Sequence, residues 1–214
     1  MTASDILIVI GRQFGSGGRA LGRELSHRLS VPFYDKELLS EAAKQFGISL
    51  PIFERHDERK PSILRAVVEG AFGTTPAGLP SDGQSNNNLY TLQSHVITRL
   101  AEQGGAVFVG RTADYVLRTS PRLLSIFVHS DDASRARRIV KRGEYATEEL
   151  ALEAARKQDR LRQNYYNYYT GREWGNASNY HLSLHIGRLG LSAAADIVMQ
   201  AAYTIAKNQT NELS

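Results

Sequence analysis

The stretch "ILIVIGRQFGSGGRALGREL", residues 6–25, decides how this chain folds. Its apolar beginning belongs to a segment, residues 5–10, that is typical of a buried strand. The turn that follows contains the glycines Gly11, Gly15, Gly17 and Gly18. Beyond them, Leu21, Leu25 and Leu29 recur at helical spacing. The stretch therefore predicts a strand, a glycine-rich turn and a helix, in that order.

Such a turn is suited to binding an anion. Four glycines within eight residues are more than a strand-to-helix turn requires. They leave consecutive backbone N–H groups bare, and these groups can surround a phosphate. The following helix adds the positive end of its dipole. We therefore expect residues 11–19 to hold a phosphate group.

Two nucleotide-binding motifs compete for this loop. Residues 15–20, "GSGGRA", match the dinucleotide pattern G-x-G-x-x-A, and Asp35 lies where a ribose-binding acid belongs. That pattern needs its first glycine almost at the strand end, whereas residues 11–14 intervene here. The strict P-loop pattern G-x-x-x-x-G-K-[ST] also fails, since Gly18 replaces the lysine and Arg19 the magnesium-binding hydroxyl. The width of the loop favours a phosphate site of the P-loop kind.

The rest of the chain alternates between strands and helices. Further strands are expected at 31–35, 106–110, 123–129 and 181–186. Helices are expected at 36–46, at 89–105, from a cap at Asp131 or Asp132, at 147–170 from a cap at Thr147, and at 193–207 from a cap at Ser192. Between them, 73–88 is rich in Gly, Pro, Ser and Asn and is expected to be a loop. This alternation predicts an α/β fold with a mainly parallel sheet and helices on both faces.

Composition bounds the class of protein. The 214 residues, 42% of them hydrophobic, suit one globular α/β domain with room for a small insert. The chain has no cysteine, which excludes disulfides and thiolate metal sites. It begins without a signal-like segment, and no apolar run approaches the roughly 20 residues of a membrane span. We therefore expect a cytoplasmic protein with no membrane partner.

Arginine dominates a positive charge balance. The formal net charge is +4 and the pI is about 9.4. The basic residues concentrate at 135–142 and 156–162. A solvated helix face is one interpretation, but such density is more typical of contact with a polyanion. Arginine suits bidentate contacts to phosphate, so nucleotide and nucleic acid both remain open.

Aromatic residues and histidines carry weaker signals. The stretch "YYNYYTGREW", residues 165–174, has aromatic rings that can stack on bases, which suggests an RNA-binding surface. Packing against the core or against a second copy of the chain is the default. We therefore do not expect nucleic acid as a partner, and we leave a homo-oligomer open. The six histidines have no metal-binding spacing, so no metal site made of side chains is expected.

Five stretches, in this order, resemble the cytidylate kinase-like family of nucleoside monophosphate kinases. They are "GRQFGSGGRALGREL", "PFYDKELL", "AVFVGRTADYVL", "SIFVHSDDASRARRIVKR" and "QDRLRQNYYNYYTGREWGNASNYHLSLHI". The resemblance implies a three-layer P-loop kinase fold with a five-stranded core, as one domain over residues 1–214. It also implies an acceptor-binding insert at about 36–100 and a lid at about 135–178. The implied activity is phosphoryl transfer from ATP, with magnesium, to CMP or dCMP.

On the donor side, the resemblance assigns the glycine loop to ATP. The implied ATP-binding residues are Gly11, Arg12, Gly15, Ser16, Gly17, Gly18 and Arg19. Arg160 and Arg162, in the segment "DRLR", resemble lid arginines that close over the transferring group, and Arg138 approaches it from the preceding helix. Together with Arg19, these are the expected catalytic residues, because phosphoryl transfer needs positioning and charge neutralisation. We hypothesise that Arg12 or Arg19 replaces the missing lysine.

On the acceptor side, Asp35 follows the second strand, where the family places an acid near the acceptor. Arg111 matches the family's Gly-Arg pair and is expected to bind the phosphate of the acceptor. Asp114 is expected to bind the sugar or base, or to orient Arg111. Val109 stands where related kinases have an acid, which removes one carboxylate from the magnesium shell.

Three other functions stay open. The resemblance is weakest over 49–88, which leaves room for a small-molecule kinase with a different acceptor. The absent lysine and Val109 are also compatible with a nucleotide-binding regulatory protein of weak activity. The arginine and tyrosine stretches are compatible with RNA binding, which would weaken steeply with salt.

Overall fold

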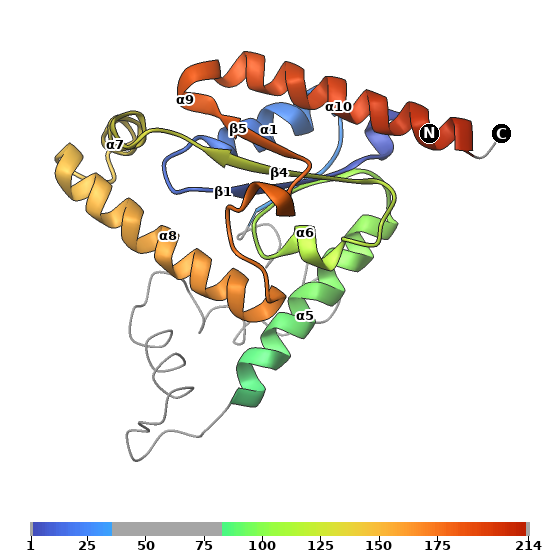
Figure 1. Cartoon of the computed structure of the whole chain (residues 1–214), viewed down its shortest axis with the longest axis horizontal. Coiled ribbons are helices and arrows are strands. Elements are labelled where there is room, and N and C mark those ends of the chain that lie inside the picture. The colour runs from blue at the N-terminus through green and yellow to red at the C-terminus, as the bar shows by residue number, and fades with distance from the viewer. Residues whose placement is uncertain (1, 36–82, 213–214) are drawn as a thin grey trace.

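A sheet of five strands forms the centre of the protein (Figure 1), whose computed structural model describes residues 2–35 and 83–212. The strands are β1 Leu7–Arg12, β2 Phe33–Tyr34, β3 Ala106–Val109, β4 Leu123–His129 and β5 Leu182–His185. Their order is β2-β3-β1-β4-β5, and every neighbouring pair is parallel. The predicted parallel sheet is therefore confirmed. The helix expected at 36–46 and residues 73–82 of the expected loop lie outside the described residues.

Strand β1 lies at the centre because both of its faces are apolar. Ile8 and Ile10 point into a core shared with α1 and α10. Leu7 and Val9 point into a second core on the other face, shared with α5 and α6. A strand buried on both faces requires such a continuous apolar run.

Helices cover both faces of the sheet, as the sequence predicts. One face carries α1 Gly18–Leu29 and α10 Leu191–Glu212. The other carries α5 Gly83–Glu102 and α6 Ala113–Val116 (Figure 1). A short 3-10 turn, Ala3–Asp5, precedes β1, and another, Ala177–Asn179, precedes β5.

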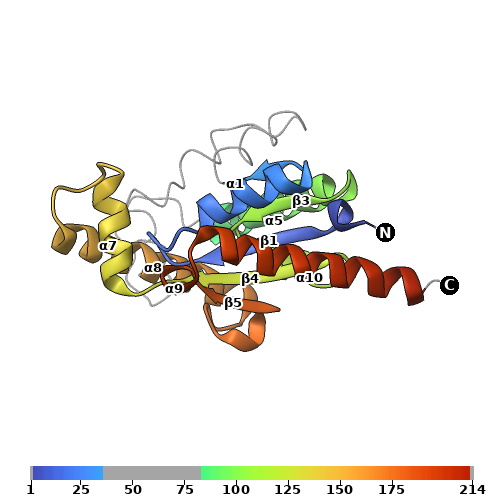
Figure 2. The same ribbon diagram turned by 90° about the horizontal axis from the view of Figure 1, so that it is seen from above.

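Two more helices stand beyond the end of the sheet to which the strands point. They are α7 Asp132–Lys141 and α8 Glu148–Thr170. Figure 2 shows α7 at this end, away from both ends of the chain. Asp131 caps α7, with Oδ1 accepting from the Ser134 N–H at 2.8 Å. Thr147 caps α8 as predicted, accepting from the Leu150 N–H at 3.3 Å.

Three predicted boundaries are wrong. Helix α5 begins at Gly83, so residues 83–88 are helical rather than loop; a helix already formed extends cooperatively through weakly unfavourable Asn and Ser. Helix α10 begins at Leu191, so Ser192 lies inside its first turn and does not cap it. The last strand ends at His185, whose Nδ1 accepts from the Arg188 N–H at 3.1 Å. This bond starts the short helix α9 Ile186–Leu189 where the strand was expected to continue.

Within residues 2–35 and 83–212, every helix is too short or too polar to cross a membrane.

Candidate active site

The carboxyl ends of β1, β2 and β3 bring the predicted donor and acceptor residues to one edge of the sheet. β1 ends at Arg12, β2 ends directly before Asp35, and β3 ends directly before Gly110. The chain order reverses at β1, because β3 lies on one side of it and β4 on the other. Ligands of parallel α/β sheets bind at such a switch point.

The glycine loop turns sharply between β1 and α1. Gly15 and Gly17 have φ angles of 75° and 101°, which residues with side chains disfavour. A Cβ at Gly15 would lie 2.8 Å from Ile139 Cδ1 and 3.0 Å from the carbonyl oxygen of Arg135. The first N–H groups of α1, which starts at Gly18, are those that a helix offers to an anion. The loop has the geometry of a phosphate cradle.

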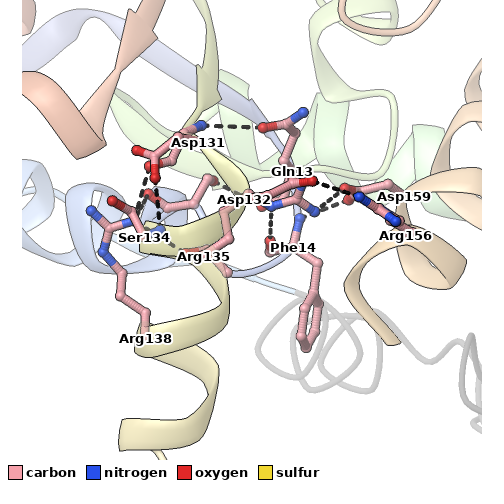
Figure 3. Close-up of polar contacts among 12 residues, drawn as sticks. Gln13, Phe14, Asp131, Asp132, Ser134, Arg135, Arg138, Arg156 and Asp159 are labelled. Atoms are coloured by element: carbon pink, nitrogen blue, oxygen red, sulfur yellow. Dashed lines mark hydrogen bonds and ion pairs between the residues drawn. The ribbon is translucent and has the colours of Figure 1, made fainter. Parts of the chain in front are cut away.

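An ion pair holds the loop from outside. The Phe14 N–H donates to Asp159 Oδ1 at 2.7 Å, and the Phe14 carbonyl accepts from Arg135 Nε at 2.8 Å (Figure 3). Arg135 and Asp159 also pair with each other, and their side chains are 4% and 14% exposed. Burial raises the pKa of Asp159, although the Phe14 N–H and the charge of Arg135 favour its ionised form. We call these three residues the Phe14 clamp.

Further contacts fix the two ends of the loop. The Gln13 N–H donates to the Val128 carbonyl at 3.0 Å, and Gln13 Oε1 accepts from the Ser130 N–H at 3.1 Å. Arg138 Nη1 lies 3.3 Å from the carbonyl oxygens of Gly15 and Ser16. Burial lowers the pKa of Arg138. The structure therefore places Arg138 against the glycine loop.

The two predicted lid arginines, Arg160 and Arg162, lie on different faces of α8. Arg162 Nη1 donates to the Arg12 carbonyl at 3.1 Å, and its guanidinium lies 5.6 Å from the centre of the Phe14 ring. Arg160 is exposed and lines a hollow on α8 together with Leu152 and Arg156. The structure thus brings Arg162 to the loop and places Arg160 on another face of the helix.

The acceptor side holds a buried carboxylate. Asp35 is 5% exposed, and its Oδ2 lies 2.6 Å from Arg19 Nη2. Arg19, predicted as a donor-side residue, therefore pairs with the acceptor side. Asp35 and Arg111 both line one narrow gap in the packing, too small for a water molecule, together with Tyr34 and Phe108. The structure brings these two predicted acceptor residues together.

The backbone at the end of β3 is strained. Gly110, Arg111 and Thr112 have φ angles of 80°, 60° and 54°. The left-handed region is unfavourable for arginine and more so for a β-branched threonine. Thr112 Oγ1 donates to the Arg111 carbonyl at 2.6 Å within this turn. Strain of this kind concentrates at functional sites, and here it sets the direction in which Arg111 leaves the sheet.

Asp114 connects the acceptor side to the lid helix. It is 7% exposed, and its Oδ2 accepts from the Tyr166 hydroxyl at 2.8 Å. Burial raises the pKa of Asp114, while the Tyr166 hydroxyl favours its charged form. Burial and the Asp114 charge both raise the pKa of Tyr166 as well. Helix α8 therefore contacts both the glycine loop and the acceptor side.

Replacing Asp114 with asparagine is expected to stabilise the fold increasingly as pH rises. The unfolded carboxyl ionises near its ordinary pKa of 3.8, whereas the folded one keeps its proton to a higher pH. Between these two values the unfolded state is favoured by losing a proton, so the acid costs stability above pH 3.8. Asparagine does not titrate and can still accept from Tyr166. Urea unfolding from about pH 4 to 7 measures the difference between variant and wild type; a constant difference would contradict the assignment.

Sequence reasoning missed Arg135, Asp159 and Tyr166. Their partners lie 121, 145 and 52 residues away along the chain, so no local sequence motif predicts these contacts. A signal does exist in the spacing of α8, because Asp159, Arg162 and Tyr166 follow one another at helical intervals on the face that packs inward.

The aromatic stretch packs within the protein. Tyr169 stacks on Tyr90 of α5 with ring centres 4.3 Å apart, and Tyr165 donates to Gln93 Oε1 at 3.1 Å. Trp174 meets Phe127 of β4 edge-on at 5.1 Å. Tyr168 alone among the tyrosines of this stretch is largely exposed, at 65%. These contacts anchor the end of α8 and favour packing over base stacking.

The residues that the structure describes are compatible with a magnesium ion held through a nucleotide. Val109 stands where the family resemblance implies an acid, and it is buried among apolar side chains at the end of β3. No three His, Asp or Glu side chains in the described part of the chain are grouped to hold a metal. His181 Nδ1 accepts from the Ser125 N–H at 3.1 Å, which gives it a structural role. Mg²⁺ commonly keeps its waters and phosphate ligands, so these residues fit an ion carried by ATP and not a protein cage.

Comparison with known families and structures agrees with this architecture. The sequence pattern of the cytidylate kinase-like family matches residues 7–188. An uncharacterized protein from Eubacterium ventriosum ATCC 27560 is similar in structure, with a TM-score of 0.69, 26% identity, and coverage of 92% of this chain and 98% of that one. No curated protein matches the chain.

Two kinases of known structure share the fold. A gluconokinase from Sinorhizobium meliloti 1021 has a TM-score of 0.54 at 15% identity, over 98% of both chains. A shikimate kinase from Acinetobacter baumannii, solved in complex with shikimate, has a TM-score of 0.50 at 14% identity, over 98% of this chain and 96% of that one. At these identities the likeness concerns the fold alone. It confirms the three-layer P-loop kinase fold that the sequence predicts.

Proposed function

This chain belongs to the cytidylate kinase-like family, and from that premise we propose that it transfers the γ-phosphoryl group of ATP to CMP or dCMP. The observation that carries the proposal is the glycine loop between β1 and α1, which lies within the matched residues 7–188. We further propose a single domain over 1–214, with an acceptor-binding insert at about 36–100 and a lid at about 135–178.

The donor side positions phosphates. ATP supplies the phosphoryl group, and the magnesium that it carries spreads the charge of its phosphates. The amides of residues 15–19 bind the β-phosphate at the start of α1. Arg138 and Arg162, both in contact with the loop backbone, present positive charge from the lid helices. Arg160 would reach the site only if the lid rotates, since it is exposed on another face of α8.

The acceptor side recognises a second phosphate and a sugar. Arg111 leaves the strained end of β3 and binds the acceptor phosphate through its guanidinium. Asp35 accepts from a hydroxyl of the acceptor while its other contact, to Arg19, holds the carboxylate in place. Asp114, held by Tyr166, either accepts from the sugar or base or orients Arg111.

The decisive experiment is ADP release from Mg-ATP with a panel of acceptors. The panel comprises CMP, dCMP, UMP, AMP, GMP, gluconate, shikimate and no acceptor. Strong stimulation by CMP or dCMP is expected. Stimulation by gluconate or shikimate alone would indicate a small-molecule kinase with a different acceptor. ATP binding without turnover would indicate a regulatory protein, and the absence of both would refute the proposal.

Replacing Arg111 with alanine is expected to raise the KM for CMP by roughly 10- to 100-fold, because a charge-assisted hydrogen bond is worth about 1.5–3 kcal/mol. The KM for ATP should change little, since Arg111 lies on the acceptor side. Steady-state kinetics with each substrate varied in turn measures both constants. Arg118→Ala is the matched control, because Arg118 is exposed and stacks on Tyr115 at 4.1 Å. An equal rise in both KM values would contradict an acceptor-specific role.

A further inference from the structure

We propose that Arg12 supplies the positive charge that a lysine supplies in other P-loops. The proposal rests on the proposed function, since it concerns the phosphoryl group that passes between donor and acceptor. The sequence leaves Arg12 and Arg19 as alternatives for this role. The structure separates them by where each side chain runs.

The side chain of Arg12 lies over the position where lysine belongs. A Cβ built on Gly18 would lie 2.6 Å from Arg12 Cβ and 3.0 Å from its Cγ. Real side chains do not approach so closely, so the stem of Arg12 fills the space that a residue at position 18 would need. The glycine at the lysine position and the arginine at the end of β1 are therefore complementary.

The guanidinium of Arg12 ends between the donor and acceptor sides. A Cβ built on Gly110 would lie 2.9 Å from Arg12 Cζ, so the charged group rests against the backbone at the end of β3. The next residue is Arg111, which lines the same narrow gap as Asp35. The Arg12 side chain therefore runs from the glycine loop to the predicted acceptor residues, and a guanidinium in this position can follow a phosphoryl group that passes between them.

The base of Arg12 is fixed. Arg12 pairs with Val128 in the sheet, and its carbonyl accepts from Arg162 Nη1 at 3.1 Å. Arg162 is 14% exposed and belongs to α8. A catalytic cation needs such preorganisation, because a charge that has to reorganise during the reaction stabilises the transition state less.

The guanidinium of Arg19 pairs with Asp35. Its Nη2 lies 2.6 Å from Asp35 Oδ2, and Asp35 is 5% exposed. A buried carboxylate is stabilised by a positive partner, so this ion pair holds the Arg19 guanidinium toward the acceptor side. Arginine at position 12 also suits the task, since its planar guanidinium binds two phosphate oxygens at once and stays charged.

The test compares variants that separate charge from shape. Arg12→Met keeps the stem over Gly18 and removes the charge, and it is expected to lower turnover by roughly 100-fold, as loss of one transition-state donor does. Gly18→Lys alone should be inactive, because the new side chain collides with Arg12. Arg12→Ala/Gly18→Lys frees that space and restores a lysine, so it should turn over at least tenfold faster than Arg12→Ala. Arg28→Ala removes a partly exposed arginine near the far end of α1, together with its pairs to Glu24 and Asp196. It is the charge control and should stay near wild type.

The outcomes distinguish this inference from the proposed function. If wild type releases ADP and Arg12→Met does so within twofold of it, the inference is wrong and the function stands. If wild type has no turnover with any acceptor, the affinity of each protein for Mg-ATP is measured by calorimetry. An affinity of Arg12→Met at least tenfold weaker than that of wild type supports the inference, and an equal affinity overturns it. If wild type does not bind Mg-ATP either, both fail. Circular dichroism checks that each variant is folded.

Discussion

Replacing Asp159 with alanine is expected to lower the free energy of unfolding by about 3 kcal/mol, the loss typical of a broken buried ion pair. Arg135, 4% exposed, would lose its more buried carboxylate partner and keep only the pair with Asp132, at 3.2 Å. The Phe14 N–H would also lose its acceptor at 2.7 Å. We expect the lower end of the usual range because Asp159 retains 14% exposure. Urea unfolding followed by circular dichroism measures the loss.

The same two helices provide the control. Arg156 pairs with Asp132 at 2.9 Å, but these side chains are 58% and 46% exposed. Removing that pair with Arg156→Ala should cost at most about 1 kcal/mol, because water screens exposed charges. A loss for Asp159→Ala no larger than the loss for Arg156→Ala would contradict the Phe14 clamp.

Replacing Asp159 with asparagine separates the hydrogen bond to the Phe14 N–H from the ion pair with Arg135. Its amide oxygen can still accept from the Phe14 N–H, but it does not neutralise Arg135. Stability should therefore fall between wild type and Asp159→Ala. ADP release should fall roughly 10-fold or more in Asp159→Ala and less in Asp159→Asn, because displaced loop amides no longer meet the phosphates. Equal turnover in both variants would show that the hydrogen bond to Phe14 does not position the loop.

The fold could be predicted because its signals are local. The apolar run before Gly11, the glycines of the loop and the alternation of strands with helices each depend on residues close in sequence. Helix limits were less predictable. The start of α5 at Gly83 depends on cooperative extension, and the start of α10 at Leu191 on the Gly190 carbonyl, which accepts from the Ala194 N–H at 3.3 Å.

The candidate site could be predicted as a set of segments but not as a set of contacts. Strand ends of a parallel sheet meet at one edge, so Asp35 and Arg111 could be brought together from sequence. The segment "DRLR" predicted which turn of α8 approaches the glycine loop, but not which of its two arginines faces the loop. Residues three apart share a helix face, so Arg162 faces the loop with Asp159, whereas Arg160 is turned about 100° away. Which face packs inward depends on tertiary contacts that no local pattern contains.

The same limit applies to the missing lysine. Sequence could show that a cation was absent at Gly18 but not from which direction another would come. Arg19 is nearer in the sequence to the expected place, yet it turns to Asp35. Arg12 lies six positions before Gly18 and crosses it. The packing of Arg12 against two glycines, Gly18 and Gly110, and the pairing of Arg19 with Asp35 are tertiary contacts, and together they favour Arg12 over Arg19.

Gly15→Ala is expected to damage the protein more than Gly143→Ala, although the two glycines have nearly the same φ, 75° and 72°. Alanine in the left-handed region costs about 1–2 kcal/mol at either position. At Gly143 no described atom lies within 4 Å of the new Cβ, so the conformational cost is the whole effect. At Gly15 the Cβ meets Ile139 Cδ1 at 2.8 Å and the Arg135 carbonyl at 3.0 Å. Overpacking of this kind adds about 1–3 kcal/mol.

The collision at Gly15 also has a functional consequence. The Arg135 carbonyl belongs to α7, whose position the Phe14 clamp fixes, so the loop is the part that moves. A displacement of about 1 Å in a positioning element can cost roughly 100-fold in rate, and we expect ADP release by Gly15→Ala to fall by about that factor. Gly143→Ala should lose much less. Urea unfolding and ADP release measured on both variants decide the matter, because equal losses at the two positions would mean that backbone conformation alone, and not the fit of the loop against α7, maintains the phosphate cradle.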